Sequence, residues 1–350
     1  MKKVGIFTIN DDGNFGNRLQ NYAVQEVLKK YDIDVATIRK RNILKKLKNF
    51  IKRNLKKVIK RNKYKREVNF GKFNKNIVFK YYNTDKELKK LSSKYDYFIT
   101  GSDQVWNPNF GRMSDIDFLT FAPDEKRVSF SASFGIEKIP NELHEFYKSR
   151  LKNFKALSVR EEAGKKIIEE LTDIKDSEVL IDPTMLLQAS EWDKVAKAPK
   201  KVPTKRYILN YFLGNISDKR KLEIERIAKE NDCEIINILE ETNPYYCCGP
   251  SEFLYLEKNA FLICTDSFHS SVFAILYNVP FIIFDREDSN VSMNSRIETL
   301  INKFKLKNRK FVEKITEENL KHDYSEAYII LEQERKKSSI FLKKALEIKE

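Results

Sequence analysis

The stretch Phe261-Leu-Ile-Cys-Thr-Asp-Ser-Phe-His-Ser-Ser-Val-Phe-Ala-Ile275 contains the joint from which the fold can be predicted. The apolar run over 261–264 is typical of a buried strand, and after a polar turn the apolar residues resume as in a buried helix. Parallel sheets built from such units bind ligands at the carboxyl ends of their strands, beside helix N-termini that attract anions. His269 lies at this turn, and histidine is the side chain best suited to proton transfer near neutral pH. The alternative is that Asp266 and Ser267 only cap the helix and that His269 packs in its first turn.

The strand–turn–helix pattern recurs along the chain. Strands are predicted at 4–9, 34–38, 95–100, 127–132, 156–159 and 179–181, and again at 207–212, 234–238, 261–264 and 280–284. Segments whose apolar residues recur at helical spacing lie between many of these strands. A proline-bearing polar stretch at 196–206 divides the first series of strands from the second. We therefore predict an α/β protein of two doubly wound, Rossmann-like domains that face a cleft. The N-terminal domain is expected over 1–195, the C-terminal domain over 205–310, and a helical tail that packs across both over 311–350.

The net charge of +15 arises from one local segment. Of the 66 Lys and Arg residues, fifteen lie between Arg39 and Arg66, where no acidic residue occurs, and the rest equal the 51 acidic residues in number. Apolar residues recur at helical spacing inside this segment, which predicts a basic amphipathic helical insertion over 39–66. Such a helix suits an anionic membrane surface, an acidic glycan or a lipid phosphate. The alternative is that its apolar stripe packs on the domain and its charges are simply solvated.

Other features of composition bear on location and metal binding. The chain has no run of about eighteen apolar residues, and its start turns polar too early for a secretory signal, so we expect a cytoplasmic protein, peripheral at the inner face of the membrane if the basic helix binds lipid. Its four cysteines lack the spacing of a disulfide framework or of a zinc site. We therefore expect ordinary thiols.

The predicted first domain has two polar strand ends of its own. The loop over 10–20 contains Asn14, Asn17 and Gln20, which can hydrogen-bond hydroxyl or phosphate oxygens, and it matches neither the Walker nor the GxGxxG pattern. Ordinary turn chemistry is the alternative for this loop. At the second strand end, Ser102, Asp103 and Gln104 precede Trp106. An aromatic ring beside a carboxylate and amides is a common sugar-binding composition, whereas the alternative is a helix cap beside a core tryptophan.

Two later strand ends also carry polar side chains. Arg160 follows the strand predicted at 156–159 and offers a planar fork for a carboxylate or phosphate, unless it only pairs with Glu161 or Glu162. Asp182 follows the strand predicted at 179–181, where it can serve as a turn former before proline.

Taken together, these segments resemble the polysaccharide pyruvyl transferase family. The matching segments, in family order, are Gly13–Asn17 with Gln20–Tyr22, Gly101–Trp106, Ser158–Glu161, Asp182–Thr184, Thr265–Ser270 and Asn294–Ile297. The resemblance implies a fold like that of the GT-B glycosyltransferases. It also implies transfer of pyruvate from phosphoenolpyruvate onto two hydroxyls of one sugar, with a ketal formed and phosphate released, and no cofactor or metal.

The resemblance places Arg160 and the segment around His269 at the donor site, and the chemistry of the other polar residues suggests their roles. The phosphoenolpyruvate site is expected to contain Arg160, Ser267, Ser270 and Arg296, because the donor carries a carboxylate and a phosphate. His269 is expected to act as acid or base, with Asp103 or Asp266 in the complementary role. The acceptor side of the cleft is expected to contain Asn14, Asn17, Gln20, Ser102, Gln104 and Trp106.

The chain departs from the family pattern at Ser267, where some members carry an arginine two residues before the histidine. Arg296 or Arg18 is expected to supply that cation instead. The acceptor is expected to be a cell-surface glycan or its lipid-linked precursor, with no nucleic acid as partner. Two other functions stay open at this point: a GT-B glycosyltransferase that uses a nucleotide sugar, and a nucleic-acid-binding protein built around 39–66.

Overall fold

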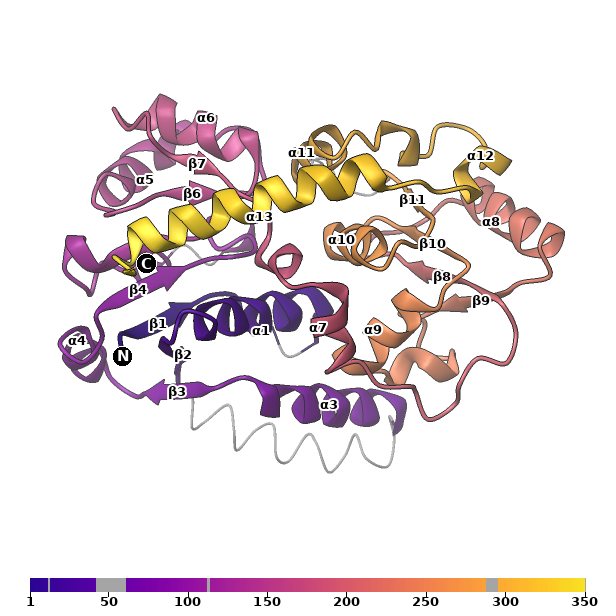
Figure 1. The fold of residues 1–350 in the computed structure, drawn as a ribbon, viewed down its shortest axis with the longest axis horizontal. Coiled ribbons are helices and arrows are strands. Elements are labelled where there is room, and N and C mark those ends of the chain that lie inside the picture. The colour runs from indigo at the N-terminus through magenta and orange to yellow at the C-terminus, as the bar shows by residue number, and fades with distance from the viewer. Residues whose placement is uncertain (12, 42–60, 112–113, 288–294, 350) are drawn as a thin grey trace.

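The computed structural model describes residues 1–11, 13–41, 61–111, 114–287 and 295–349. The chain forms two α/β halves, each built on a parallel sheet with helices on its faces (Figure 1). The predicted α/β class with two Rossmann-like halves is thereby confirmed. Most of the predicted basic helix, residues 42–60, lies outside the described residues.

The first sheet is parallel throughout. It consists of β1 (Lys3–Phe7), β2 (Asp34–Lys40), β3 (Phe79–Tyr82), β4 (Tyr97–Thr100) and β5 (Arg127–Ser129), in the order β3-β2-β1-β4-β5. The short strands β6 (Ser158–Val159) and β7 (Glu178–Val179) pair with each other and continue the sheet beyond β5 through isolated bridges. Sequence patterning missed β3 because two of its four residues, Lys80 and Tyr81, are exposed at the edge of the sheet.

The second sheet repeats this plan with fewer strands. It consists of β8 (Tyr207–Tyr211), β9 (Glu234–Asn237), β10 (Leu262–Thr265) and β11 (Phe281–Ile283), in the order β11-β10-β8-β9. In each sheet the direction of winding reverses beside the first strand, between β1 and β4 and between β8 and β10. Ligands of open α/β sheets bind at such reversal points, beyond the carboxyl ends of the strands.

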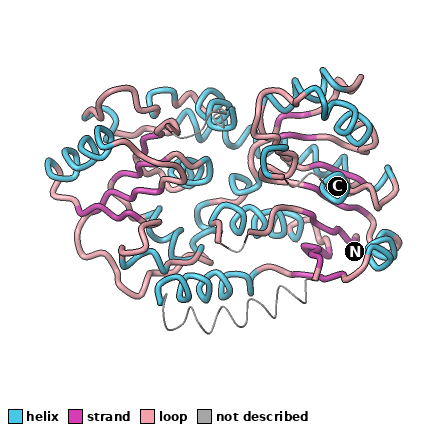
Figure 2. The backbone as a smooth tube through the Cα atoms, turned by 180° about the vertical axis from the view of Figure 1, so that it is seen from behind, coloured by secondary structure: helices cyan, strands magenta, loops and turns pink. Residues whose placement is uncertain are grey.

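Helices cover both sheets, as the view from behind shows (Figure 2). They are α1 (Phe15–Lys29), α3 (Arg61–Phe73), α4 (Asp85–Ser92), α5 (His144–Leu151), α6 (Glu162–Leu171), α7 (Ala189–Asp193), α8 (Asp218–Glu230), α9 (Pro250–Lys258), α10 (Phe268–Leu276), α11 (Ser295–Lys303), α12 (Glu317–Leu320) and α13 (Ser325–Ala345). The prediction that the helical insertion begins at Arg39 is wrong. Arg39 and Lys40 instead continue β2, where they pair with Tyr81 and Tyr82 of β3.

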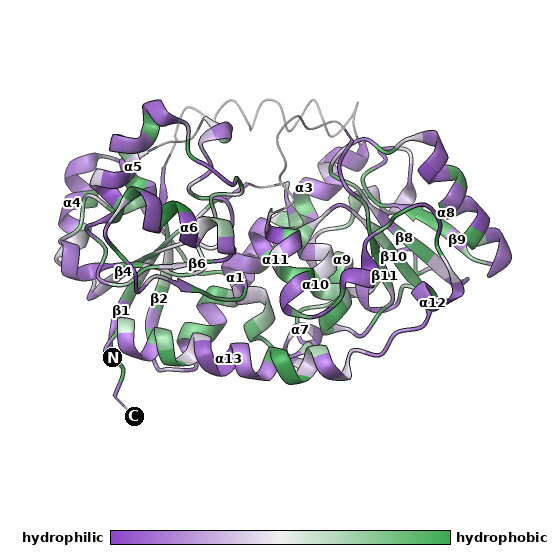
Figure 3. Ribbon diagram, turned by 90° about the horizontal axis from the view of Figure 1, so that it is seen from above, coloured by the Kyte–Doolittle hydropathy of each residue, from purple (hydrophilic) through white to green (hydrophobic). Residues whose placement is uncertain are grey.

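Aromatic packing and two helices connect the halves. Phe15 of α1 stacks on Phe253 of α9, with 4.4 Å between the ring centroids, and on Phe70 of α3. Arg66 of α3 donates from Nη1 to the carbonyl of Tyr246 in the second half, at 3.0 Å. Helix α13 runs along both halves, with its hydrophobic residues interspersed among polar ones (Figure 3). None of the described helices is both long and apolar enough to cross a bilayer.

Candidate functional site

Strand ends of the first half and helix starts of the second half bring five ionisable side chains together. Asp103 follows β4, Arg160 follows β6, and Asp182 follows β7, while His269 stands in the first turn of α10 and Arg296 in that of α11. All five are buried. Parallel strands place the residues that follow them at one edge of the sheet, and the second half presents α10 and α11 to that edge.

Asp182 is the centre of this cluster. Its Oδ2 accepts hydrogen bonds from Ser102 Oγ at 2.7 Å and from Arg160 Nη1 at 2.6 Å, and its Oδ1 accepts from the backbone N–H and hydroxyl of Thr184. His269 Nε2 lies 3.8 Å from Oδ2, beyond hydrogen-bond distance. Burial by itself would raise the pKa of Asp182, but His269, which is protonated at the acid pH where Asp182 titrates, together with Arg160 and Thr184 lowers that pKa well below its usual range. Asp182 is therefore a carboxylate at neutral pH.

Asp103 is the second carboxylate of the cluster. Its backbone has a φ of +68°, and its side chain accepts hydrogen bonds from Asn17 Nδ2 and from the N–H of Gln104. Arg160 Nη2 lies 3.6 Å from Asp103 Oδ1. Burial opposes ionisation of Asp103, but Arg160, with His269 and Arg296, outweighs it and lowers the pKa. Asp103 thus connects Arg160 to the amide-rich loop at the start of α1.

Two guanidinium groups lie over the same aromatic ring. The guanidinium carbon of Arg160 is 4.4 Å, and that of Arg296 5.9 Å, from the ring centroid of Phe268. Burial, followed by repulsion from Arg160, lowers the pKa of Arg296 to about 10. Among the described residues, Arg160 Nε and Nη2 and Arg296 Nε find no hydrogen-bond partner. Buried donors rarely remain unpaired, so this pair of cations suits an anion with several oxygens.

His269 is held against the first turn of α1. A Cβ atom on Gly16 would lie only 2.6 Å from Cγ of the His269 ring, so the close approach requires glycine at that position. Burial lowers the pKa of His269, although Asp182 and Asp103 oppose that shift. His269 Nε2 has no hydrogen-bond partner in the described part of the chain. At neutral pH the ring is therefore uncharged and able to accept a proton.

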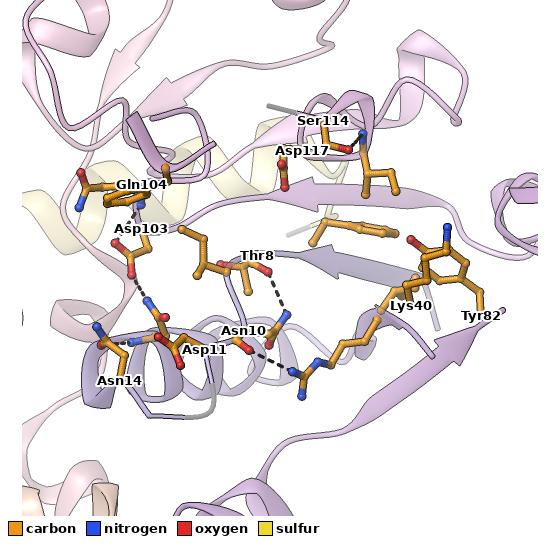
Figure 4. A pocket seen from close by; sticks show the side chains of 17 residues that line it. Thr8, Asn10, Asp11, Asn14, Lys40, Tyr82, Asp103, Gln104, Ser114 and Asp117 are labelled. Atoms are coloured by element: carbon orange, nitrogen blue, oxygen red, sulfur yellow. Dashed lines mark hydrogen bonds between the residues drawn. The ribbon is translucent and has the colours of Figure 1, made fainter. Parts of the chain in front are cut away.

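A cavity of about 970 Å³ lies at the carboxyl ends of β1, β2 and β4, beside this cluster. Figure 4 shows Asp103, Gln104 and Asn14 at one end of the cavity and Lys40 with Tyr82 at the other. Its lining combines amides, carboxylates, a hydroxyl-bearing ring and cations, which can bind the hydroxyls and faces of sugar rings. Three of the predicted acceptor-side residues, Asn14, Asn17 and Gln104, line it.

The structure corrects two acceptor-side predictions. Trp106 is a core residue: its ring stacks on Phe118, and its Nε1 donates to the carbonyl of Asp117 at 3.0 Å. Gln20 is fully buried and donates from Nε2 to Thr8 Oγ1, so it supports the strand end from within. Both were assigned to the cleft because sequence position alone cannot show on which side of a strand end a side chain lies. Ser102 does belong to the site, through its bond to Asp182.

Two of the residues expected near His269 are directed elsewhere. The hydroxyl of Ser270 donates to Glu257 of α9 at 2.6 Å, on the inner side of α10. The carboxylate of Asp266 accepts from the backbone N–H groups of Leu213 and Gly214 and from Arg286. These bonds correct the expected roles of Ser270 and Asp266, because both side chains are already occupied by other parts of the second half. Ser267 is buried at the N-cap of α10 and makes no side-chain cap bond.

Sequence reasoning missed the importance of three residues. Asp182 was recognised as a polar strand end and as part of a family segment, but it was given no role in the site, because a turn former before proline was the alternative. Glu161 accepts three hydrogen bonds at Oε1, from Ser133 Oγ and the N–H groups at 134 and 135, and so fixes the turn that carries Arg160. The importance of Gly16 could not be seen in the sequence, because its contact with His269 joins residues of different halves. No group of three or more His, Cys, Asp or Glu side chains within the described ranges is arranged to hold a metal.

Comparison with solved structures identifies the architecture. A glycosyltransferase from Rickettsia africae ESF-5 superposes with a TM-score of 0.50 at 17% sequence identity, covering 99% of this chain and 97% of that one. A UDP-N-acetylglucosamine 2-epimerase from Rickettsia bellii gives a TM-score of 0.51 at 12% identity, with the same coverage of 99% and 97%. At such low identities the likeness shows the fold alone, which is GT-B-like as predicted.

Sequence comparison identifies the family. A search of curated proteins found no significant match. The family model described as polysaccharide pyruvyl transferase matches residues 14–289, a span that includes Asp103, Arg160, Asp182 and His269. The resemblance seen in the sequence is thereby confirmed: the chain is a polysaccharide-modifying transferase that belongs to the polysaccharide pyruvyl transferase family.

Proposed function

We propose that this protein transfers pyruvate from phosphoenolpyruvate onto two hydroxyls of one sugar and so forms a cyclic ketal. The observation that supports this most directly is the pair of buried guanidinium groups, Arg160 and Arg296, whose unpaired donors lie beside an uncharged histidine. Phosphoenolpyruvate carries a carboxylate and a phosphate, and guanidinium forks bind both groups. Some family members carry an arginine at the position of Ser267, and Arg296 is a better candidate than Arg18 to supply that positive charge here. Arg18 is completely buried in α1, where its Nη1 donates to Asn10 Oδ1.

The reaction requires three proton movements. The methylene carbon of phosphoenolpyruvate gains a proton, two sugar hydroxyls each lose one, and phosphate leaves with the second of these protons. Two new C–O bonds form at the former enol carbon, and the C–O bond to phosphate breaks. The central carbon passes through an oxocarbenium-like state, which nearby carboxylates stabilise.

Each residue of the cluster suits one part of this chemistry. Arg160 and Arg296 would hold the donor anion, and that anion would raise the pKa of His269 toward the range in which it can both accept and return a proton. Asp103 borders the cavity and would orient or deprotonate an acceptor hydroxyl. Asp182 would keep Arg160 in place and stabilise the protonated form of His269.

Activity on a panel of synthetic and lipid-linked glycosides tests this function. With phosphoenolpyruvate present, we expect phosphate release in step with the mass gain of a pyruvyl group on the acceptor. The His269→Ala variant should lose at least about a hundredfold in kcat, as expected for removal of a general acid–base. Arg296→Ala should chiefly raise the KM for phosphoenolpyruvate, whereas Arg18→Ala should leave that KM unchanged. Normal turnover by His269→Ala would contradict the proposed role.

The acceptor and the cellular location form a second part of the proposal. We infer that the protein works at the inner face of the membrane on a cell-surface glycan or its lipid-linked precursor. Lys86, Lys89 and Lys90 are exposed on α4 and Lys80 is exposed on β3, and the sequence over 39–66 adds further basic residues. A lysine near an anionic bilayer contributes about 1 kcal/mol to binding.

Vesicle sedimentation tests the membrane inference. Neutralising Lys86, Lys89 and Lys90 with glutamine should weaken binding to phosphatidylglycerol vesicles by about tenfold or more, given that contribution per lysine. Lys205, Lys229 and Lys336 are exposed in other parts of the molecule, so changing these three to glutamine is the matched control and should have little effect. Equal binding to neutral phosphatidylcholine vesicles would rule out the electrostatic mechanism.

A further inference from the structure

The turn between β8 and α8 occupies the position at which a second α/β domain would receive a phosphate. β8 is the first strand of its sheet, and the winding reverses between β8 and β10. In doubly wound folds, the first strand–helix turn at this reversal offers backbone N–H groups to the phosphates of a nucleotide. The turn runs from Phe212 to Ser217, between the end of β8 and the start of α8.

A carboxylate of the protein itself already occupies the near part of this turn. Asp266, directly after β10, accepts from the N–H of Leu213 at 2.7 Å through Oδ1 and from the N–H of Gly214 at 2.8 Å through Oδ2. Arg286 Nε donates to the same Oδ2 at 3.1 Å. Two backbone N–H groups and a guanidinium are the donors that a phosphate would use. Asp266 itself is buried, whereas Leu213 is exposed and Gly214 and Arg286 are half-buried.

A second carboxylate occupies the far part of the turn. Glu287 accepts from the backbone N–H of Ser217 at 2.8 Å and from its hydroxyl at 3.0 Å. Arg220, in the first turn of α8, lies with its Nε 3.1 Å from Glu287 Oε1. Ser217 is the N-cap of α8, so Glu287 takes the place that an anion would have at the start of that helix.

We propose that Asp266 and Glu287 determine donor specificity by acting as internal anions that exclude nucleotide diphosphates from the second half. A diphosphate entering this turn would have to displace two carboxylates, and until it did so their negative charges would repel it. The arginines over Phe268 differ, since they retain unpaired donors. The molecule therefore directs an anionic ligand to the junction of its halves and away from the β8–α8 turn.

This inference does not rest on the proposed pyruvyl transfer, because it concerns the binding of a nucleotide and not the reaction. Calorimetric titration with UDP and with inorganic pyrophosphate tests it in four proteins: the wild type, Glu287→Gln, the double variant Asp266→Ala/Glu287→Ala and the control Asp193→Ala. Asp193 pairs with Lys258 on α9, so its removal deletes an ion-paired carboxylate at another place.

We expect no saturable binding of UDP or pyrophosphate to the wild type or to Asp193→Ala. In the double variant, pyrophosphate should bind saturably, and the N–H groups at 213–217 should gain protection from hydrogen exchange when it does. Glu287→Gln should bind pyrophosphate more weakly than the double variant does. Because Glu287 is exposed, this variant should fold even if the loss of buried Asp266 prevents folding of the double variant, so the test stays decisive. Saturable binding of UDP to the wild type with protection of the same N–H groups would overturn the proposal, and so would a Glu287→Gln variant that folds but gains no affinity for pyrophosphate.

Discussion

Two kinds of buried ionisable residue in the cluster make the stability of this protein sensitive to acid. His269 is uncharged at neutral pH, whereas Asp103 and Asp182 are carboxylates. A histidine whose pKa is lowered by folding takes up its proton more readily in the unfolded chain. A carboxylate whose pKa is lowered by folding is protonated more readily in the unfolded chain as well. All three groups therefore favour unfolding as the pH falls, but in different ranges.

The first step of acid destabilisation should depend on His269. Below its ordinary pKa of about 6.5, the unfolded chain binds a proton that the folded protein resists, so the stability falls from that pH downward. The contribution of Asp103 and Asp182 is complete above their ordinary pKa of about 3.8 and is lost as the pH falls through and below that value. We therefore expect the loss of melting temperature between pH 7 and pH 5 to be smaller in His269→Gln than in the wild type. His322→Gln is the control, and an equal loss in both variants would show that His269 is not the group responsible.

At the level of the element, helix α1 positions residues of the site. Its N-cap, Asn14, accepts from the N–H of Asn17, and Asn17 in turn donates to Asp103. The same turn carries Gly16, whose missing side chain leaves room for His269 of α10. The start of α1 thus positions a carboxylate of the first half and the histidine of the second half together.

The Gly16→Ala variant separates this positioning from stability. The new methyl group must displace the His269 ring, but alanine favours a helix over glycine by about 1 kcal/mol, which offsets part of that cost. The melting temperature should therefore change little. A shift of about 1 Å at a reacting group can cost a hundredfold in rate, so we expect kcat to fall at least about tenfold. Gly71→Ala in α3 is the matched control, because a Cβ there meets no atom within 4 Å. A Gly16→Ala enzyme with wild-type kcat would exclude the positioning role.

At the scale of the whole molecule, one large hydrophobic cluster extends through both halves. A single cluster of buried residues includes Val4 and Leu19 of the first half and Phe253 and Phe273 of the second. Helix α13 adds to this connection, since Arg335 donates to the carbonyls of Met185 and Leu187 and the helix then reaches the first sheet. The site at the junction therefore depends on packing that is distributed over the length of the chain.

Replacement of Phe341 in α13 should weaken the whole molecule. Phe341 is buried and stacks on Phe130 of the first half, and loss of a buried phenylalanine typically costs 3–5 kcal/mol. We expect Phe341→Ala to lower the free energy of unfolding by about 3 kcal/mol in urea titrations. Its neighbour Ile340 is 66% exposed, so Ile340→Ala should change that free energy by less than about 0.5 kcal/mol. Equal effects of the two substitutions would mean that the end of α13 does not support the core.

Local pattern was enough to predict the α/β class, most of the strands, the family and the polar strand ends at Asp103, Arg160 and His269. These features depend on residues that are close in sequence, because strand and helix periodicity and turn chemistry act over a few residues. The edge strand β3 was missed because half of it is exposed. Tertiary structure alone decided which strand ends meet. It brought Asp182 to Arg160 and His269, directed Trp106 into the core and turned Asp266 toward the β8–α8 turn. Some of these contacts, such as that between His269 and Asp182, join residues more than eighty positions apart. They follow from strand order and from the packing of the two halves, which no local pattern encodes.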